Sequence, residues 1–445
     1  MKHFILFHFL LFAMLFVFPQ QGFTTPILNA KEIPIMRIES DQLTPLEKGL
    51  EVGRQSKKLF PDIEKRYDTH LATLLTPSLS RKLQQEILPQ LLKQLPPEYQ
   101  EELNGVAQAW SLTRTNQLGD GELSLKEYQL LNLLPDLGVF PDGTGFGVFG
   151  EVAKDNSPII GRNLDWTSTP ELRSLQAITV YQSSDKAFVN IGFAGIISVL
   201  TGFNHRGLFL AYNKAEPYLL YQQTPHSLEN IHSSVFDLRQ VLESRWSNQQ
   251  ATLYLSKQSY RYSHSILISD KNNIQILEYP RGGVAKIRRW NSPTRIDKPW
   301  DKKLQQIALI GCHVLASLPN NCRSIKESYH WTRLSQLAIF TPSTPADAYD
   351  IRDILADRKN HLFEIFNAKT LQSIIYQPKN NYLSLYTATI KKTSVLSPIY
   401  HTYPDIIPEG LEHRVNNNKR LILWGITAFL FFLMAWLVWQ DRNSH

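Results

Sequence analysis

Residues 143–166 constrain the fold of this chain more than any other segment. The first half, residues 144–152, alternates aromatic or β-branched side chains with glycine, a pattern typical of a strand. Asp155 and Asn156 then predict a turn into a second strand. That strand ends in the sequence GRNLDW, which carries Arg162 and Asp165. We therefore predict a β-hairpin with an arginine and an aspartate close together at its end.

The motif PI-x-GRNLDW after a strand and a turn resembles the active-site hairpin of one family of N-terminal nucleophile (Ntn) hydrolases. This is the acyl-coenzyme A:6-aminopenicillanic-acid acyltransferase-like family, and acid ceramidase and choloylglycine hydrolase are more distant relatives. In the family, a cysteine freed by self-cleavage opens the first strand. Its thiol attacks an amide carbonyl, and its α-amine is the base. The position that aligns with this cysteine is Gly143, which offers no nucleophile.

Further stretches extend the resemblance over about residues 45–390. Residues 192–213 are similar to a family pattern that contains LTG-x-N-x-x-GL, and residues 263–279 match its next hairpin. Where family members usually carry Thr-Asn-His, this chain has Gly-Cys-His, so Cys312 replaces the asparagine expected to bind the oxyanion. The resemblance implies an α+β fold, a four-layer αββα sandwich that follows an N-terminal helical segment.

The resemblance also implies roles for individual residues. Arg162 would contact the substrate or the nucleophile, and Asp165 would hold the α-amine. The substrate-binding candidates are Asn163, Asn213, Cys312 and Arg333. An Arg–Asp pair is also a common structural clip between strands, so both interpretations stay open for Arg162 and Asp165.

Thr144 is the candidate for a shifted nucleophile. Cleavage between Gly143 and Thr144 would present a hydroxyl and an α-amine on one residue, as in threonine-type Ntn enzymes. A shift of one residue turns the side chain to the other face of the strand. The expected direction is therefore away from Arg162 and Asp165, unless the strand begins with a bulge.

The chain has two cysteines, Cys312 and Cys322, too few for a disulfide framework. Three interpretations of Cys312 stay open: a nucleophile paired with His313 or His330, a half-buried side chain, or a disulfide with Cys322. Because the sequence contains no CxxC or HExxH spacing, we expect no metal and no other cofactor.

Both ends of the chain carry apolar segments. Residues 1–30 read as a signal peptide or an uncleaved anchor. Residues 421–440 form an apolar run of about 20 residues, enough for a transmembrane helix. Residues 391–420 read as a stalk, and 441–445 as a short tail. We expect a membrane protein whose main domain is extracytoplasmic, on the periplasmic side of a bacterial membrane.

Between these segments, the pattern predicts a helical, pro-segment-like region over residues 31–142 and an Ntn-hydrolase-like domain over residues 143–390. Helices are expected from 45 to 137, with a capping box at Ser124, and two more within 229–257. Strands are expected at 175–181, 187–192, 196–201, 208–212, 265–269 and 274–278, with turns at 202–207 and 270–273.

Composition limits the possible partners. Hydrophobic residues make up 43% of the 445 residues, as in a globular protein with a core. The formal net charge of +7 comes from no single basic run, so a nucleic-acid partner is not expected. We predict a small N-acylated or peptide-like ligand and contact with a membrane through residues 421–440. The sequence gives no prediction of the oligomeric state.

Loss of the cysteine and the asparagine predicts degenerate or absent catalysis. The alternative is an active amidase or acyltransferase that uses Thr144.

Overall fold

The computed structural model describes residues 32–215, 230–244, 247–300, 303–359, 364–389, 398–404 and 406–407. The predicted signal segment and the predicted membrane helix at residues 421–440 lie outside these ranges. Within the ranges, no helix is both long enough and apolar enough to cross a bilayer.

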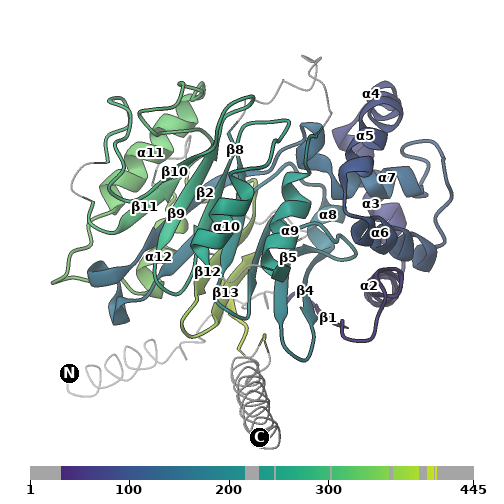
Figure 1. The fold of residues 1–445 in the computed structure, drawn as a ribbon, viewed down its shortest axis with the longest axis horizontal. Coiled ribbons are helices and arrows are strands. Elements are labelled where there is room, and N and C mark those ends of the chain that lie inside the picture. Colours follow the sequence, from purple (N-terminus) through teal and green to yellow (C-terminus); the bar gives the residue numbers. More distant parts are fainter. Residues whose placement is uncertain are drawn as a thin grey trace, which may run out of the picture. The chain divides into compact units, whose positions relative to one another are not determined.

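Residues 45–137 fold mainly into helices, as the periodicity predicts, and these helices lie together in Figure 1. Capping boxes begin two of them, at Thr44 and at Ser124. The bounds are α2 Pro45–Leu59, α3 Ile63–Leu74, α4 Pro77–Lys82, η1 Leu83–Ile87, α5 Leu88–Gln94, α6 Pro97–Trp110, α7 Leu125–Asn132 and η2 Leu134–Leu137.

The strands form two sheets, as expected for the predicted α+β class. The eight-stranded sheet runs, in spatial order, β1 Ile35–Glu39, β4 Gln176–Gln182, β5 Ala187–Phe193, β6 Thr201–Asn204, β7 Phe209–Lys214, β8 His264–Ser269, β9 Ile274–Tyr279 and β10 Lys286–Arg288. The six-stranded sheet runs β11 Gln306–Leu309, β2 Asp142–Val148, β3 Ile159–Asp165, β12 Thr370–Gln377, β13 Tyr382–Thr387 and β14 His401–Thr402. The predicted hairpin, β2 and β3, therefore lies inside the smaller sheet.

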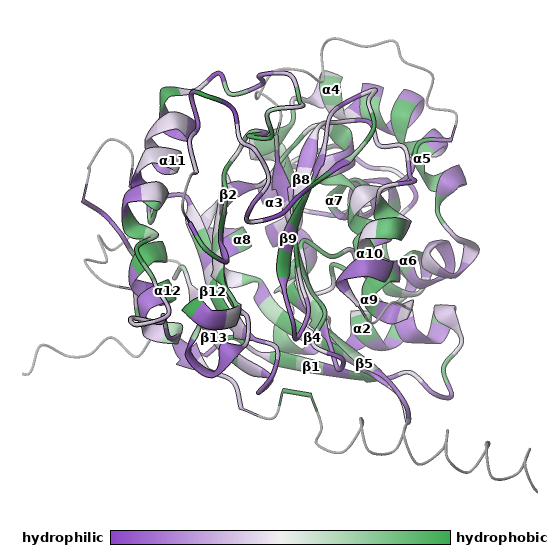
Figure 2. Ribbon diagram, turned by 60° about the vertical axis from the view of Figure 1, so that its left-hand side comes forward, coloured by the Kyte–Doolittle hydropathy of each residue, from purple (hydrophilic) through white to green (hydrophobic). Residues whose placement is uncertain are grey.

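The remaining helices follow or interrupt the strands. They are η3 Gly150–Val152, η4 Lys154–Asn156, α8 Pro170–Ser174, α9 Ser234–Ser244, α10 Asn248–Leu255, α11 Ile325–Leu337 and α12 Ala348–Leu355. Figure 2 shows hydrophilic and hydrophobic sides on α9 and α10, as expected for helices that cover a sheet.

Three apolar cores hold the layers of helices and sheets together. One core joins the N-terminal helices, α9 and α10 to the outer face of the eight-stranded sheet. A second lies between the two sheets and contains, for example, Ile178 and Ile374. The third joins the six-stranded sheet to α11 and α12, through residues such as Trp331 and Ile351. The order of layers is helix, sheet, sheet, helix.

Four segments differ from the expectations. Residues 196–200 are not a strand, because side chains of Asn132 and Asn190, rather than a neighbouring strand, bind their backbone groups. The predicted turn at 202–207 is half strand, since β6 runs to Asn204. The segment before the helices contains β1, which pairs in parallel with β4. Part of the predicted stalk is β14, which pairs with β13.

Candidate active site at the start of β2

The two faces of the β2–β3 hairpin pack against different layers: one against the eight-stranded sheet and the other against the helices. A Cβ atom added to Gly145 would meet Leu267 of the eight-stranded sheet, and one added to Gly161 would meet Leu355 of α12. Arg162 is paired with Gly145 across the hairpin and extends towards the eight-stranded sheet. By the alternation of strand side chains, Thr144 and Asp165 face the helices α11 and α12. Thr144 therefore points away from Arg162, as expected. The expectation that it also points away from Asp165 is wrong, because Arg162 and Asp165 are three residues apart on β3 and face opposite ways.

Gly143 is enclosed by backbone. Its φ angle is +148°, a conformation that side chains rarely allow. A Cβ atom at this position would lie 1.9 Å from the carbonyl oxygen of Asn163 on β3. In this structure, the position that aligns with the family's cysteine therefore has no space for a side chain.

Arg162 lies fully buried between the sheets. Its guanidinium donates to Thr201 Oγ1 at 2.7 Å and to the carbonyl oxygen of Tyr212 at 2.6 Å. Its Nε–H has no hydrogen-bond partner among the residues that the structure describes. Burial lowers the pKa of Arg162 to about 9, although the charges of Asp165 and Asp142 oppose the shift. The guanidinium thus stays charged at neutral pH with one buried donor unused.

Asp165 lies at the end of β3, nearly inaccessible to solvent. Its two oxygens accept hydrogen bonds from Thr370 Oγ1 at 2.7 Å and Asn367 Nδ2 at 2.6 Å. The Lys326 ammonium lies 3.6 Å from Asp165 and 3.8 Å from Asp142, and so bridges the two carboxylates. Lys214, at the end of β7, approaches Asp142 from the other sheet at 3.4 Å. We call Asp142, Asp165, Lys214 and Lys326 the charged cluster.

The charges in the cluster nearly balance, with two lysines facing two aspartates. Burial would raise the pKa of Asp142, but Lys214 and Lys326 outweigh that effect, so the pKa lies below its ordinary value. The Lys326 side chain is 31% exposed and that of Asp142 is 18% exposed. The cluster is therefore the part of the site that solvent and ligands reach first.

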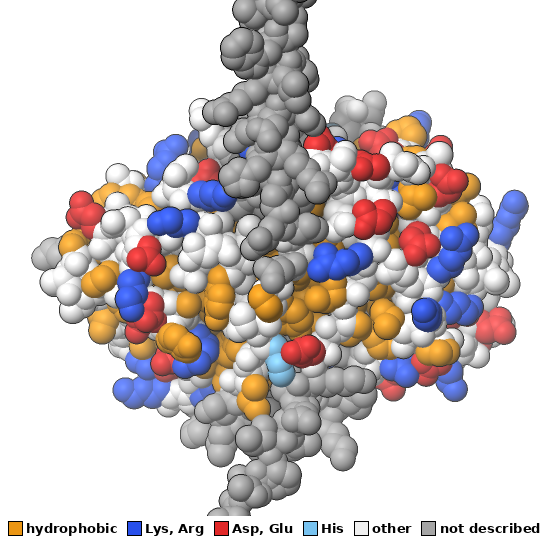
Figure 3. All heavy atoms as spheres, turned by 90° about the horizontal axis from the view of Figure 1, so that it is seen from below, with side chains coloured by type: hydrophobic (Ala, Val, Ile, Leu, Met, Phe, Trp, Pro, Cys, Tyr) orange, Lys and Arg blue, Asp and Glu red, His pale blue; other side chains and the backbone are white. Residues whose placement is uncertain are grey.

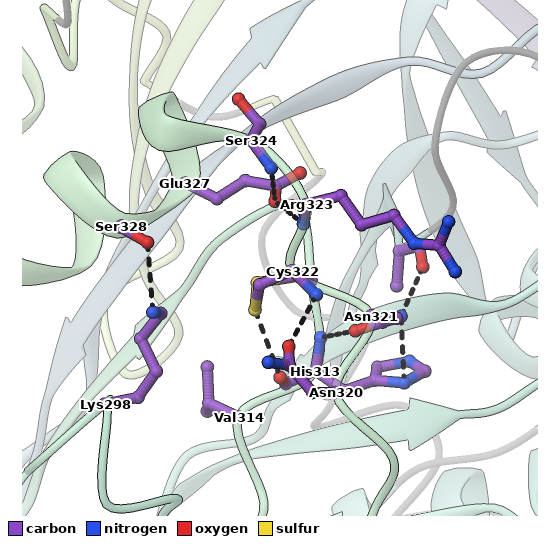
Figure 4. Close-up of a disulfide and its surroundings, with 12 residues drawn as sticks. Lys298, His313, Val314, Asn320, Asn321, Cys322, Arg323, Ser324, Glu327 and Ser328 are labelled. Carbon is purple, nitrogen blue, oxygen red and sulfur yellow. Dashed lines mark hydrogen bonds between the residues drawn. A yellow bond between two sulfur atoms is a disulfide. The ribbon is translucent and has the colours of Figure 1, made fainter.

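The first turn of α11 places Lys326 in the cluster. Ser324 and Glu327 form a capping box that begins the helix, and the disulfide Cys312–Cys322 ties the preceding loop to the chain beyond β11 (Figure 4). A lysine in the first turn of a helix is unfavourable next to the helix dipole. The attraction of the Lys326 ammonium to the two aspartates offsets this cost. The cluster therefore holds Lys326 in place.

The disulfide decides between the interpretations of Cys312. With its sulfur bonded to Cys322, Cys312 has no thiol, so it is neither a nucleophile nor an S–H donor. In the described ranges, the single group with the spacing of metal ligands combines the two cysteines with Glu327. Both sulfur atoms are already used in the disulfide, so these residues do not fit a metal ion.

The other candidates from the sequence separate into two groups. Asn213 belongs to the site, because its Nδ2 lies 3.5 Å from the Gly143 carbonyl oxygen, and its Oδ1 is buried without a partner in the described chain. Asn163 instead binds the carbonyl oxygens of Leu355 and Ile365 on the helix side. Arg333 forms a two-point ion pair with Asp357, at 2.5 and 2.9 Å. The Nδ2 group of Asn163 and the guanidinium of Arg333 are thus bound within the fold, while Asn163 Oδ1 is buried without a partner in the described chain.

Sequence reasoning missed Asp142, Lys214 and Lys326. Asp142 directly precedes Gly143, so its position alone was a usable signal. Lys214 follows Asn213 at the end of a predicted strand, where side chains often reach a neighbouring layer. Lys326 has no local signal, since its approach to Asp165 depends on the loop that the disulfide closes.

Surface charge adds no competing site on the face drawn in Figure 3. Lysine and arginine side chains are interspersed there with aspartate and glutamate. The net charge of +7 is therefore not gathered into one basic patch on that face.

Facing sheets between helix layers, with a polar site at the start of one central strand, define the αββα class expected of Ntn hydrolases. The family model of acyl-coenzyme A:6-aminopenicillanic acid acyl-transferase matches residues 152–391, more than half of the 445 residues, and the chain belongs to this family. The match begins after β2, so position 143 lies outside it. No curated protein sequence matches the chain.

Several solved structures are similar to parts of the chain. An N-acylethanolamine-hydrolyzing acid amidase ortholog of Caenorhabditis elegans is 16% identical, with 53% of this chain and 92% of that chain covered and a TM-score of 0.38. A variant of conjugated bile acid hydrolase from Clostridium perfringens is 15% identical, covering 59% and 96%, with a TM-score of 0.37. Penicillin V acylase from Agrobacterium tumefaciens is 13% identical, covering 60% and 88%, with a TM-score of 0.37.

Proposed function

We propose that this protein binds a small N-acylated or peptide-like ligand at the start of β2 and does not cleave it. The packing of Gly143 carries the proposal. An N-terminal nucleophile needs a hydroxyl or thiol side chain. A Cβ atom at position 143 would overlap the Asn163 carbonyl oxygen, at 1.9 Å. The position is therefore built for glycine rather than for a lost cysteine.

The charged cluster supports an uncut chain. In the family, the aspartate that matches Asp165 is expected to hold the α-amine freed by cleavage. Here the Lys326 ammonium lies 3.6 Å from Asp165 without any cleavage. Lys326 thus supplies the positive charge that the carboxylate would otherwise take from a new chain end.

Two buried groups fit an amide. Arg162 Nε–H is a donor and Asn213 Oδ1 an acceptor, and neither has a partner in the described ranges. Unpaired buried polar atoms are costly, so a ligand that pairs with them gains affinity. The carbonyl oxygen of an acyl amide would accept from Arg162, and its N–H would donate to Asn213.

The proposal includes a location for this site. Residues 1–30 would direct secretion, and residues 421–440 would anchor the chain in a membrane. The ligand-binding domain would then lie outside the cytoplasm.

The test uses full-length protein purified from membranes and a fluorogenic N-acyl aminocoumarin, which becomes fluorescent when its amide is cleaved. We expect denaturing mass spectrometry to show one chain that is not cut between Gly143 and Thr144. We also expect saturable binding of the probe and no released amine. Arg162→Met should weaken binding at least tenfold. Arg54→Met, which alters an exposed ion pair with Glu51, is the matched control and should bind normally.

Thr144 defines the second candidate function, an amidase or acyltransferase with a shifted nucleophile. Two observations favour it: Thr144 on β2 and Asp165 on β3 lie on the same face of the hairpin, and the Thr144 hydroxyl is buried without a partner in the part of the chain described. This function predicts two chains split between Gly143 and Thr144. It also predicts amine release that Thr144→Val abolishes. Either result would overturn the binding-only proposal.

A further inference from the structure

A second polar site lies outside the charged cluster, between the eight-stranded sheet and the helices α3, α7 and α8. It is a cavity with about 30 Å³ of space for the centres of water-sized molecules. A single water needs roughly 10–15 Å³ by this measure. The walls are largely apolar, and they include Tyr67, Leu131, Leu134, Leu172, Phe193 and Leu200.

Three polar side chains line the cavity with unused atoms. His70 Nε2, Trp166 Nε1 and Asn190 Oδ1 are buried without a hydrogen-bond partner in the described residues. The three side chains belong to residues that are 1%, 5% and 3% exposed, respectively. Most buried polar groups in proteins are paired, so three orphans around one cavity indicate a missing partner.

The hydrogen-bonding roles of two of these atoms, on Trp166 and Asn190, are fixed. Trp166 Nε1–H can only donate. Asn190 Nδ2 already donates to the carbonyl oxygens of Ile196 and Ser198, so its Oδ1 is the atom left to accept. A partner must therefore accept from Trp166 and donate to Asn190.

The partner must also be neutral. Burial lowers the pKa of His70 to about 4, so its ring is uncharged at neutral pH. Among the described side chains that line this cavity, there is no lysine, arginine, aspartate or glutamate. The charge of Glu171 acts on His70, but Glu171 is not in the lining. A carboxylate or an ammonium group would find no counter-ion here.

The cavity is preformed on one side. The connection from β5 to β6 forms a wall, and the hydroxyls of Tyr67 and Tyr128 bind the carbonyl oxygens of Ala194 and Gly195 in it. Asn132 Oδ1 accepts from the backbone N–H groups of Ile197 and Ser198 in the same wall. A ligand would thus bind without ordering this segment, which favours affinity.

We propose that this cavity binds a neutral, short-chain aliphatic primary amide. The amide carbonyl accepts from Trp166 Nε1–H, the amide N–H donates to Asn190 Oδ1, and the alkyl chain packs on the leucine walls. Water alone fits less well, because each buried water needs two to four polar partners and most of these walls are apolar. Trp166 directly follows Asp165 of the charged cluster, just beyond the end of β3. No residue of the charged cluster lines this cavity, and neither do Arg162 and Asn213, so the site is distinct from the one in the proposed function and independent of it.

Butyramide is the probe, and isosteric butyrate is the control for charge. Titration of full-length protein, followed by ligand-observed NMR, should show saturable binding of butyramide and at least tenfold weaker binding of butyrate. Trp166→Phe keeps the ring and removes the donor, and should weaken butyramide binding at least tenfold. Trp300→Phe removes a buried indole donor that binds the Gln306 carbonyl oxygen elsewhere, and should leave binding unchanged.

A second variant keeps the test independent of Trp166. Leu131→Phe adds volume to the cavity wall and should abolish butyramide binding while Trp166 stays intact. Absence of saturable butyramide binding, equal binding of butyrate, or full binding by Leu131→Phe would overturn the proposal. A crystal structure with butyramide that shows only water in the cavity would do the same.

Discussion

The backbone around Gly143 leaves no space for a nucleophilic side chain at this position. The positive φ of Gly143 and the position of the Asn163 carbonyl oxygen act together, because this backbone conformation would direct an added Cβ atom at that oxygen on the neighbouring strand. Any residue with a Cβ atom must push the neighbouring strands β2 and β3 apart. Restoring a cysteine at this position would therefore damage the fold before it created a nucleophile.

Gly143→Ala should lower the free energy of unfolding by about 2–4 kcal/mol, since it combines backbone strain with a backbone clash. Urea unfolding measures the change. Gly121→Ala is the matched control, because Gly121 also has a positive φ, of +91°, but nothing lies within 4 Å of an added Cβ. It should cost about 1 kcal/mol. Equal losses for the two variants would contradict the role of the Asn163 contact.

Lys326 is the second decisive residue, and its replacement tests the charged cluster. Lys326→Met should lower the stability at pH 7 by about 1–2 kcal/mol, because it leaves the buried Asp165 carboxylate without its bridging ammonium. The part of this loss that comes from Asp142 should shrink as the pH falls below the ordinary aspartate value of about 3.9 and through the lowered pKa of Asp142. A stability loss that does not change with pH would argue that Lys326 acts through packing rather than charge.

At the scale of elements, α9 begins against a buried carboxyl group. Asp136 accepts hydrogen bonds from Ser233 and Ser234, which lie at the start of this helix. Burial raises the pKa of Asp136 to about 6, and the serine hydrogen bonds only partly oppose it. Between about pH 4 and pH 6, the Asp136 carboxyl group therefore stays protonated in the folded chain and is ionised in the unfolded chain.

The pH dependence follows from that shift. Between the unfolded pKa of about 3.9 and the folded value near 6, the folded chain binds the proton more tightly. Stability contributed by Asp136 is therefore complete below about pH 4 and is lost as the pH rises through 6, by about 3 kcal/mol. Asp136→Asn should remove this component, as measured by urea midpoints at pH 4.5 and 7. An unchanged difference between the two midpoints would refute the assignment.

A buried ion pair joins two other elements, α6 and α9. Arg239 Nη2 lies 2.6 Å from Glu102, and its guanidinium also lies 4.6 Å from the ring centre of Tyr181. Glu102→Gln should cost about 3–5 kcal/mol, because it leaves a buried guanidinium without its main counter-charge. Glu102→Leu combined with Arg239→Met should cost less than Glu102→Gln alone. A double-mutant cycle in thermal unfolding measures the difference, and simple additivity would contradict the pairing.

At the scale of the whole molecule, the sequence predicted what depends on near neighbours. The hairpin of β2 and β3 followed from alternation and the turn at Asp155 and Asn156, and both turn residues have positive φ. The strand β1 was missed because its partner, β4, lies some 140 residues further along the chain. The approach of Lys326 to Asp165 was missed for the same reason, since a disulfide loop and a helix start bring them together.

The parallel pairing of β1 with β4 has a consequence for any cut beside Gly143. The residues before the cut would contribute a strand to the eight-stranded sheet and several helices to its apolar core. The backbone N–H of Ile33 also binds the Tyr403 hydroxyl, and Arg37 binds the Ile406 carbonyl oxygen. A nicked molecule would keep both fragments as one particle in size-exclusion chromatography. Processing would change the covalent chain and leave the assembly whole.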